Sequence, residues 1–183
     1  VAEQLKLTPE KINEALLQSR EKLYQERMTR PAPLLDDKIL TSWNGLMISA
    51  FAQAGLILSE DNYVRQAAQA ADFILKNMRK NGRLLRSYKA GEAYHNAYLD
   101  DYAFLIAGLL DLNEATAEPR WLQQAIDLQQ VLDKHYRDEQ NGGYFLTSDD
   151  HEDLLVREKP AYDAAEPSGN SVALMNLLRL YEF

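Results

Sequence analysis

A chain of 183 residues is long enough for one ordinary domain with a buried core. Its 46% hydrophobic and 26% charged residues argue against a disordered chain, and no apolar run approaches the roughly 20 residues that span a bilayer. The net charge of -8 disfavours a nucleic-acid partner, because phosphate binding depends on clustered Lys and Arg. The absence of cysteine excludes a disulfide scaffold and thiolate metal ligands, and we expect a soluble cytoplasmic protein that does not bind membranes.

The opening segment, residues 1–35, predicts a leading helix and a proline-containing linker. Thr8 has the form of an N-cap before Pro9, and the helix should run to about Arg27, after which two prolines end it. The chain starts at Val1 and closes in an apolar helical stretch without a stop signal, so we expect it to be cut from a longer protein.

Two pairs of helices follow the linker. Apolar periodicity predicts them over residues 43–58 and 62–79, and again over 96–116 and 120–136. Each pair ends at a glycine-containing stop, and short extended pieces are predicted after the stops, at residues 83–88 and 144–147. Residues 89–95, which include a glycine, are predicted to be a loop.

The two pairs form a repeat. Tyr63 and Trp121 occupy equivalent places and are 58 residues apart in the numbering. A third copy begins at Ser168 and contains its first helix only. The repeats divide the chain into a leading segment, a first hairpin repeat, a second repeat with its long loop, and a truncated third repeat, residues 1–35, 36–95, 96–167 and 168–183.

The helices of a pair differ in their apolar pattern. The first members, such as Leu99 to Leu112, are apolar nearly all round, which is typical of helices enclosed on every side. The second members carry a single apolar stripe. We therefore predict an all-α fold, a partial α/α toroid with inner and outer helices and short extended pieces in the inter-hairpin loops.

Loop lengths indicate where a site should lie. Connections within a pair are about four residues long, whereas the connections between pairs, residues 80–95 and 138–167, are long. Because the helices alternate in direction, the long loops and the N-termini of all the inner helices should share one end of the molecule, which we call the loop face. Exposed backbone donors and long loops favour binding there.

Polar residues of three segments converge on the loop face. Paired carboxylates beside an aromatic ring suit a sugar, since the ring stacks on C-H groups and the acids bind hydroxyls or move protons. The catalytic candidates are Asp37, His95, Asp101 and Glu166, and the substrate-binding candidates are Asp36, Lys38, Trp43, Asn44, Tyr102, Arg157, Asp163, Ser168 and Asn170.

Each candidate also has a structural explanation. Asp36, Ser42 or Ser168 can cap a helix, Trp43 can pack in a core, and acids in a first helical turn are stabilising without catalysis. His95 can be a surface loop residue, and the acids near Arg157 can form an ion network that holds a long loop. His135 and His151 are expected to be structural or solvent-facing.

Several chemistries have no motif in this sequence. It contains no Gly-rich phosphate loop, no His-Glu-x-x-His helix and no Gly-x-Ser-x-Gly elbow. We therefore expect no cofactor and no metal ion.

Four segments resemble the spermatogenesis-associated protein 20 family, which includes bacterial YyaL-type members. They are the run from Arg30 to Ile48 with its Asp-Asp-Lys and Trp-Asn-Gly elements, Leu99-Asp-Asp-Tyr-Ala, Gly142-Gly-Tyr-Phe and Glu166-Pro-Ser-Gly-Asn-Ser. The resemblance implies a longer protein, with a thioredoxin-like domain before a six-hairpin toroid similar to N-acylglucosamine 2-epimerases. This chain corresponds to part of that toroid.

The leading functional hypothesis is a carbohydrate-active domain that epimerises, isomerises or hydrolyses a small sugar by acid-base chemistry. A glycosidase would need two carboxyl groups about 5 to 9.5 Å apart across a cleft. The alternative is a noncatalytic module that binds a protein partner or its own thioredoxin-like domain. We also expect self-association through the apolar end from Leu177 to Phe183.

Overall fold

The computed structural model describes residues 7–151 and 155–183, and the chain forms two compact units, residues 1–37 and 38–183. The first unit contains helix α2 (Pro9–Met28), whose N-cap Thr8 accepts a hydrogen bond from the Lys11 amide at 3.4 Å. No residue of α2 is buried, and apolar side chains such as Leu16 and Leu23 are exposed. The unit boundary lies two residues beyond the predicted linker.

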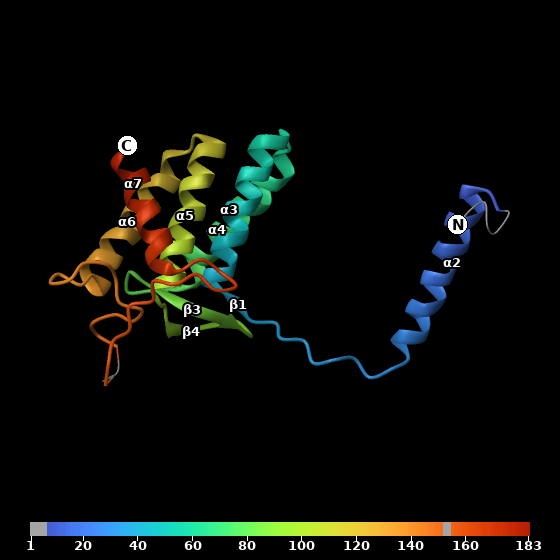
Figure 1. Cartoon of the computed structure of the whole chain (residues 1–183), viewed down its shortest axis with the longest axis horizontal. Helices are drawn as coiled ribbons and strands as arrows, with labels where there is room; N and C mark the ends of the chain where they lie inside the picture. Colours follow the sequence, from blue (N-terminus) through green and yellow to red (C-terminus); the bar gives the residue numbers. More distant parts are fainter. Residues whose placement is uncertain (1–6, 152–154) are drawn as a thin grey trace. The chain divides into compact units, whose positions relative to one another are not determined.

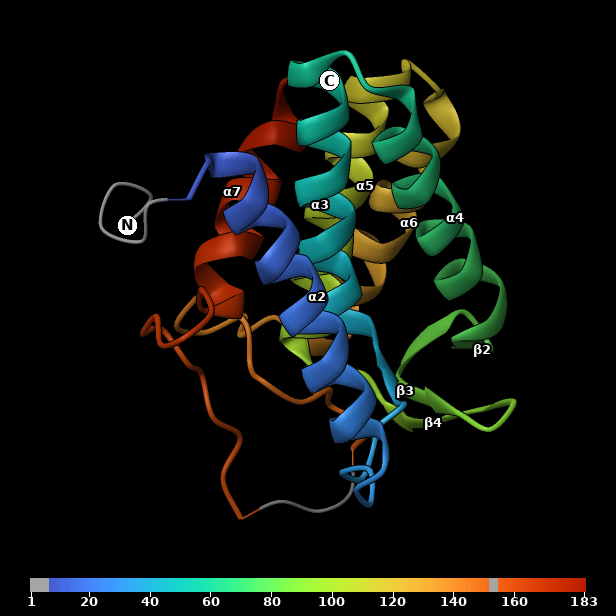
Figure 2. The same cartoon turned by 90° about the vertical axis from the view of Figure 1, so that its right-hand side faces the viewer.

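The second unit has two layers of helices (Figures 1 and 2). Its central helix is α5, which packs against a helix on either side, and the three lie next to one another: α3 (Thr41–Leu58), α5 (Leu99–Thr116) and α7 (Gly169–Tyr181). Two further helices pack against α3 and α5, namely α4 (Asp61–Asn77) and α6 (Pro119–Tyr136). The predicted inner and outer layers are therefore confirmed.

The helix positions have the spacing of the predicted repeat. Helices α3 and α5 begin 58 residues apart (99 - 41), and α4 and α6 do the same (119 - 61). Helix α5 is buried over most of its length, whereas α4 and α6 bury single stripes that include Ala67, Ile74, Trp121 and Leu128. In the part of the chain that the structure describes, no helix combines the length and apolarity needed to cross a membrane.

A small antiparallel sheet joins the helices at the loop face. Strand β3 (Arg83–Lys89) pairs with three shorter strands, β1 (Ile39–Leu40), β2 (Arg79–Lys80) and β4 (Glu92–Asn96). The prediction of a loop over residues 89–95 was wrong, because Ala90 and Gly91 both take positive φ, 52° and 89°, and form the tight turn of a hairpin. The extended piece predicted at 144–147 is reduced to one bridge, between Arg137 and Tyr144.

Helices α3 and α5 approach so closely that their backbones touch. A Cβ atom placed on Gly45 would lie 2.6 Å from the Leu105 amide nitrogen, and one on Gly108 would lie 2.8 Å from the Gly45 carbonyl oxygen. Neither obstacle is a flexible side chain. The two glycines therefore set the distance between the first and second inner helices.

We predict that Gly45→Ala lowers the free energy of unfolding by about 2 kcal/mol, since overpacking a rigid contact typically costs about 1–3 kcal/mol. In an open helix the same change would stabilise by about 1 kcal/mol. Urea unfolding of the 183-residue chain, followed by circular dichroism, measures the difference. Ala50→Ser, which also adds one heavy atom to α3 but at an exposed position, is the control, and equal effects of the two changes would contradict the account.

Candidate functional site

The N-termini of the three inner helices lie together with the sheet and the long loops at one end of the second unit (Figure 1). This is the loop face that the repeat predicts. Helix α3 begins directly after β1, α5 begins three residues after β4, and α7 begins after the long loop that follows α6. The site described below is built from residues 38–183 alone.

Asp101 is the structural centre of this face. Its side chain is fully buried, its Oδ1 accepts a hydrogen bond from the Ser42 amide at 2.9 Å, and its Oδ2 accepts one from the Tyr98 amide at 2.8 Å. Burial raises its pKa, while these amides and the nearby Arg86 guanidinium oppose that rise. We predicted Asp101 as a catalytic acid, but both oxygens are instead engaged in joining the first turns of α3 and α5.

The neighbouring Asp100 is the acid that reaches the surface. It is half-buried and accepts a hydrogen bond from the backbone of Gly169, the first residue of α7. Burial and then the charge of Glu166 raise its pKa, whereas Arg86 and the Gly169 amide lower it. Gly169 is needed for this approach, because a Cβ there would lie 2.3 Å from the Asp100 Oδ1 atom.

Arg86, which projects from β3, was missed by the sequence analysis. Its guanidinium lies 3.4 Å from the Asp101 carboxylate and 4.7 Å from the centroid of the Tyr98 ring. About a third of its side chain is exposed. The alternation of strand β3 places Arg86 on the same face as buried Leu84, a signal that could have indicated its inward position.

Two predicted ligand-binding residues have structural contacts instead. Tyr102 is fully buried, and its hydroxyl oxygen accepts a hydrogen bond from the Leu84 amide at 3.0 Å. Asn170 uses its side-chain amide to pair with both the backbone N-H and C=O of Tyr144, at 2.8 and 2.9 Å, and it also donates to the Pro160 carbonyl. These contacts hold β3 and the long loop in place.

The remaining candidates of the long loop fix the loop and the start of α7. Arg157 donates to the Thr147 and His135 carbonyls and lies over the Phe145 ring. Ser168 caps α7 by accepting from the Ser171 amide at 3.2 Å, and its own amide donates to Asp163 at 2.9 Å. Arg157 and Asp163 therefore hold the long loop through bonds to backbone groups, whereas Lys159 forms an ion pair with Asp138.

Four other candidates lie at the edge of the face. Trp43 is 61% exposed on α3, and His95 is exposed at the end of β4 with a positive φ of 61°. Asn44 donates to the Leu40 carbonyl at 2.8 Å, and Lys38 is exposed. The roles of Trp43 and His95 stay predictions.

Asp36 and Asp37 are exposed residues at the end of the first unit. Their catalytic and substrate-binding roles stay predictions. The chemistry that the second unit offers is therefore concentrated in Asp100, Glu166 and Arg86. A half-buried acid with a raised pKa, next to a second carboxylate, is suited to proton transfer.

Proteins of similar sequence show to which family the chain is related. Spermatogenesis-associated protein 20 of Homo sapiens is 42% identical over 97% of this chain, and the Rattus norvegicus protein is 45% identical over 88% of it. The chain is homologous to a segment of spermatogenesis-associated protein 20. It spans about a quarter of the length of these curated relatives, 24% and 22%. No family model matches the chain.

Solved structures place this homologue of spermatogenesis-associated protein 20 in the α/α toroid class. A cellobiose 2-epimerase from Bacillus thermoamylovorans aligns with a TM-score of 0.65 over 79% of this chain and 39% of its own, at 16% identity. An α-mannanase from Bacteroides thetaiotaomicron aligns at 0.65 over 84% and 38%, at 14% identity, and a D-mannose isomerase at 0.62 over 79% and 38%, at 15% identity. These alignments confirm the predicted fold.

We predict that Asp101→Asn destabilises the chain by about 2–3 kcal/mol. An asparagine keeps the size of the side chain but offers an N-H group where an acceptor is required, and a buried donor left unpaired typically costs about 1–3 kcal/mol. Urea unfolding at neutral pH measures the change. If Asp101→Asn were no more destabilising than the same change at Asp127, which is only partly buried, Asp101 would not hold the helix ends together.

Asp100 should make stability depend on pH in the opposite sense to an ordinary ion-paired acid. A raised pKa means that the folded chain binds the proton more tightly than the unfolded chain, so the contribution of Asp100 to stability is lost as pH rises above about 4. The Asp100→Asn variant has no such proton to lose. We expect its stability relative to the parent chain to increase between pH 4 and 7, and a constant difference across this range would contradict the assignment.

Proposed function

We propose that the loop face is a sugar-binding site in which Asp100 transfers a proton during epimerisation, isomerisation or hydrolysis. The observation that carries the proposal is the position of Asp100, half-buried beside Glu166 with a raised pKa. The toroid fold, shared with sugar epimerases, isomerases and glycosidases, supports it by analogy. The activity belongs to the longer protein, in which we also place a thioredoxin-like domain.

The two carboxyl groups have different environments, which suits different roles. Burial keeps the proton on Asp100 to a higher pH, so Asp100 can donate it to a sugar oxygen, while the side chain of Glu166 is exposed and can act as the proton acceptor. Arg86 limits the rise in the Asp100 pKa, which keeps the acid able to exchange its proton. The exposed Trp43 ring provides a surface for the C-H face of a sugar.

Turnover by the full-length protein tests this proposal. We would incubate it with mono- and disaccharides and follow anomeric, epimeric and hydrolytic changes by proton NMR. Asp100→Asn and Glu166→Gln should each lower kcat by about 100-fold or more, the usual loss for a general acid or base. Asp127→Asn, at a carboxylate of α6 that bonds only to Gln123 and Gln124 among the described residues, should leave kcat unchanged.

Two results would contradict the proposal. One is that no sugar is converted. The other is that a sugar is converted equally well by the Asp100→Asn and Glu166→Gln variants.

A second candidate function is docking of a protein partner, or of the thioredoxin-like domain. It is favoured by large apolar side chains that are exposed on α3 and α7, among them Met47, Ile57, Leu174, Met175 and Leu178. This function predicts saturable binding of a protein without conversion of any sugar. The expected self-association of the chain belongs to the same proposal, and analytical ultracentrifugation measures it.

A further inference from the structure

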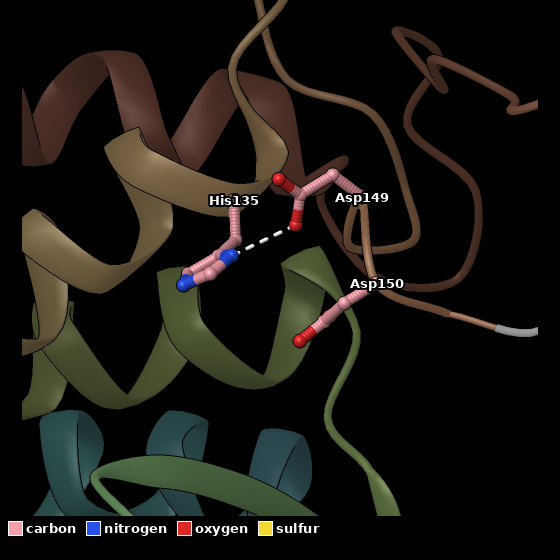
Figure 3. A group of neighbouring side chains, drawn as sticks. All are labelled: His135, Asp149 and Asp150. Atoms are coloured by element: carbon pink, nitrogen blue, oxygen red, sulfur yellow. Dashed lines mark hydrogen bonds and ion pairs between the residues drawn. The ribbon is translucent and has the colours of Figure 1, made fainter.

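A second group of polar side chains lies at the C-terminal end of α6, and it shares no residue with the proposed sugar site. His135 is in the last turn of α6, while Asp149 and Asp150 are on the loop that returns past it (Figure 3). One ligand atom from each residue lies within 4.8 Å of the other two. His135 and Asp150 also line a cavity of about 510 Å³ together with Lys80, Arg83 and Asn96.

We propose that His135, Asp149 and Asp150 bind one divalent transition-metal ion, of the Zn²⁺ kind. A neutral imidazole and two carboxylates form a mixed nitrogen and oxygen donor set, which such ions accept. Water would complete the coordination. We expected no metal ion, because the sequence contains no known metal-binding motif and His135 was expected to be structural or solvent-facing. His135 and Asp149 are 14 residues apart in the chain.

The loop that carries the carboxylates is fastened to the helix that carries the imidazole. The Asp149 amide donates to the His135 carbonyl at 2.8 Å, and the Asp149 Oδ1 atom lies 2.7 Å from His135 Nδ1. Arg157 donates to the same His135 carbonyl at 3.2 Å. Since these bonds hold the loop against the helix before any ion binds, little conformational entropy is lost on binding.

The charge and the donor atoms of His135, Asp149 and Asp150 decide which cations these side chains can bind. Arg83 forms a bidentate pair with Asp150, at 2.7 and 3.0 Å, so one of the two negative charges is already balanced. Hard ions such as Ca²⁺ need six to eight oxygen ligands and gain little from imidazole. An ion that binds imidazole strongly is therefore favoured, with Asp150 giving it one oxygen and keeping Arg83 on the other.

Unsatisfied polar atoms on the same loop point to a ligand independently of the three donors. Ser148 is only 2% exposed, and its hydroxyl lies near both Asp150 and Tyr136 but makes no hydrogen bond of regular geometry within the described residues. The Nδ1 atom of His151 is also buried and has no hydrogen-bond partner there. Buried polar atoms in proteins are nearly always paired. Water bound to a metal ion at Asp150 would give Ser148 a partner.

Titration of the 183-residue chain with ZnCl₂ by isothermal calorimetry tests the proposal. We expect one site with a micromolar dissociation constant, which His135→Gln and Asp149→Asn each weaken at least 10-fold. His95→Gln, which removes a histidine of the loop face, is the matched control and should bind like the parent chain. Absence of binding at millimolar Zn²⁺, or equal weakening by His95→Gln, would overturn the proposal.

Paramagnetic broadening locates the ion without any variant. Mn²⁺ added to the parent chain should broaden the amide NMR signals of residues 135 and 148–151 first. Broadening that starts instead at Asp100 and Glu166 would overturn the assignment and would place the cation at the sugar site.

Discussion

The arrangement of the loop face depends on one buried carboxylate. Asp101 accepts amide hydrogen bonds from the first turn of α3 and from the start of its own helix, and Arg86 of the sheet lies beside it. Helix N-termini carry unpaired N-H groups and a positive potential, so a carboxylate there accepts hydrogen bonds from the N-H groups and is also stabilised by the potential. Because two neighbouring repeats meet at this side chain, it fixes where the adjacent Asp100 can lie.

A second acid on α5 joins the inner helices farther along their length. Asp111 is buried and accepts hydrogen bonds from Ser49 and Gln53 of α3 and, at 2.7 Å, from Arg179 of α7. Together with the Gly45 and Gly108 contact, it fixes the central helix against both neighbours. Because this scaffold is rigid, the groups around the half-buried Asp100 stay in place, and the pKa of Asp100 stays constant.

The sequence was sufficient to predict the architecture. Helical periodicity indicates which faces of a helix are buried, and loop length indicates which helices are antiparallel neighbours. The repeat of 58 residues gave the equivalence of α3 and α5, and the apolar pattern gave the two layers. It was not sufficient to choose between Asp100 and Asp101. Consecutive residues on a helix point about 100° apart, and only the packing of α3 decides which of them is enclosed.

Other contacts of the site depend on residues distant in the chain. Tyr102 looked like a ligand-binding aromatic residue, but the strand pairing of β3 brings the Leu84 amide to its hydroxyl. Alternation along β3 could have indicated that Arg86 points inward, but it could not indicate that Asp101 lies beside the guanidinium. Long-range pairing of this kind leaves no local pattern in a single sequence.

The most direct test of the central claim is a carbon-detected NMR titration of the side-chain carboxyl groups in the 183-residue chain. The account predicts that Asp100 titrates above the ordinary aspartate value of about 3.9, and that Glu166→Gln lowers its pKa. An Asp100 that titrates at or below that value, and that does not respond to Glu166→Gln, would contradict the account.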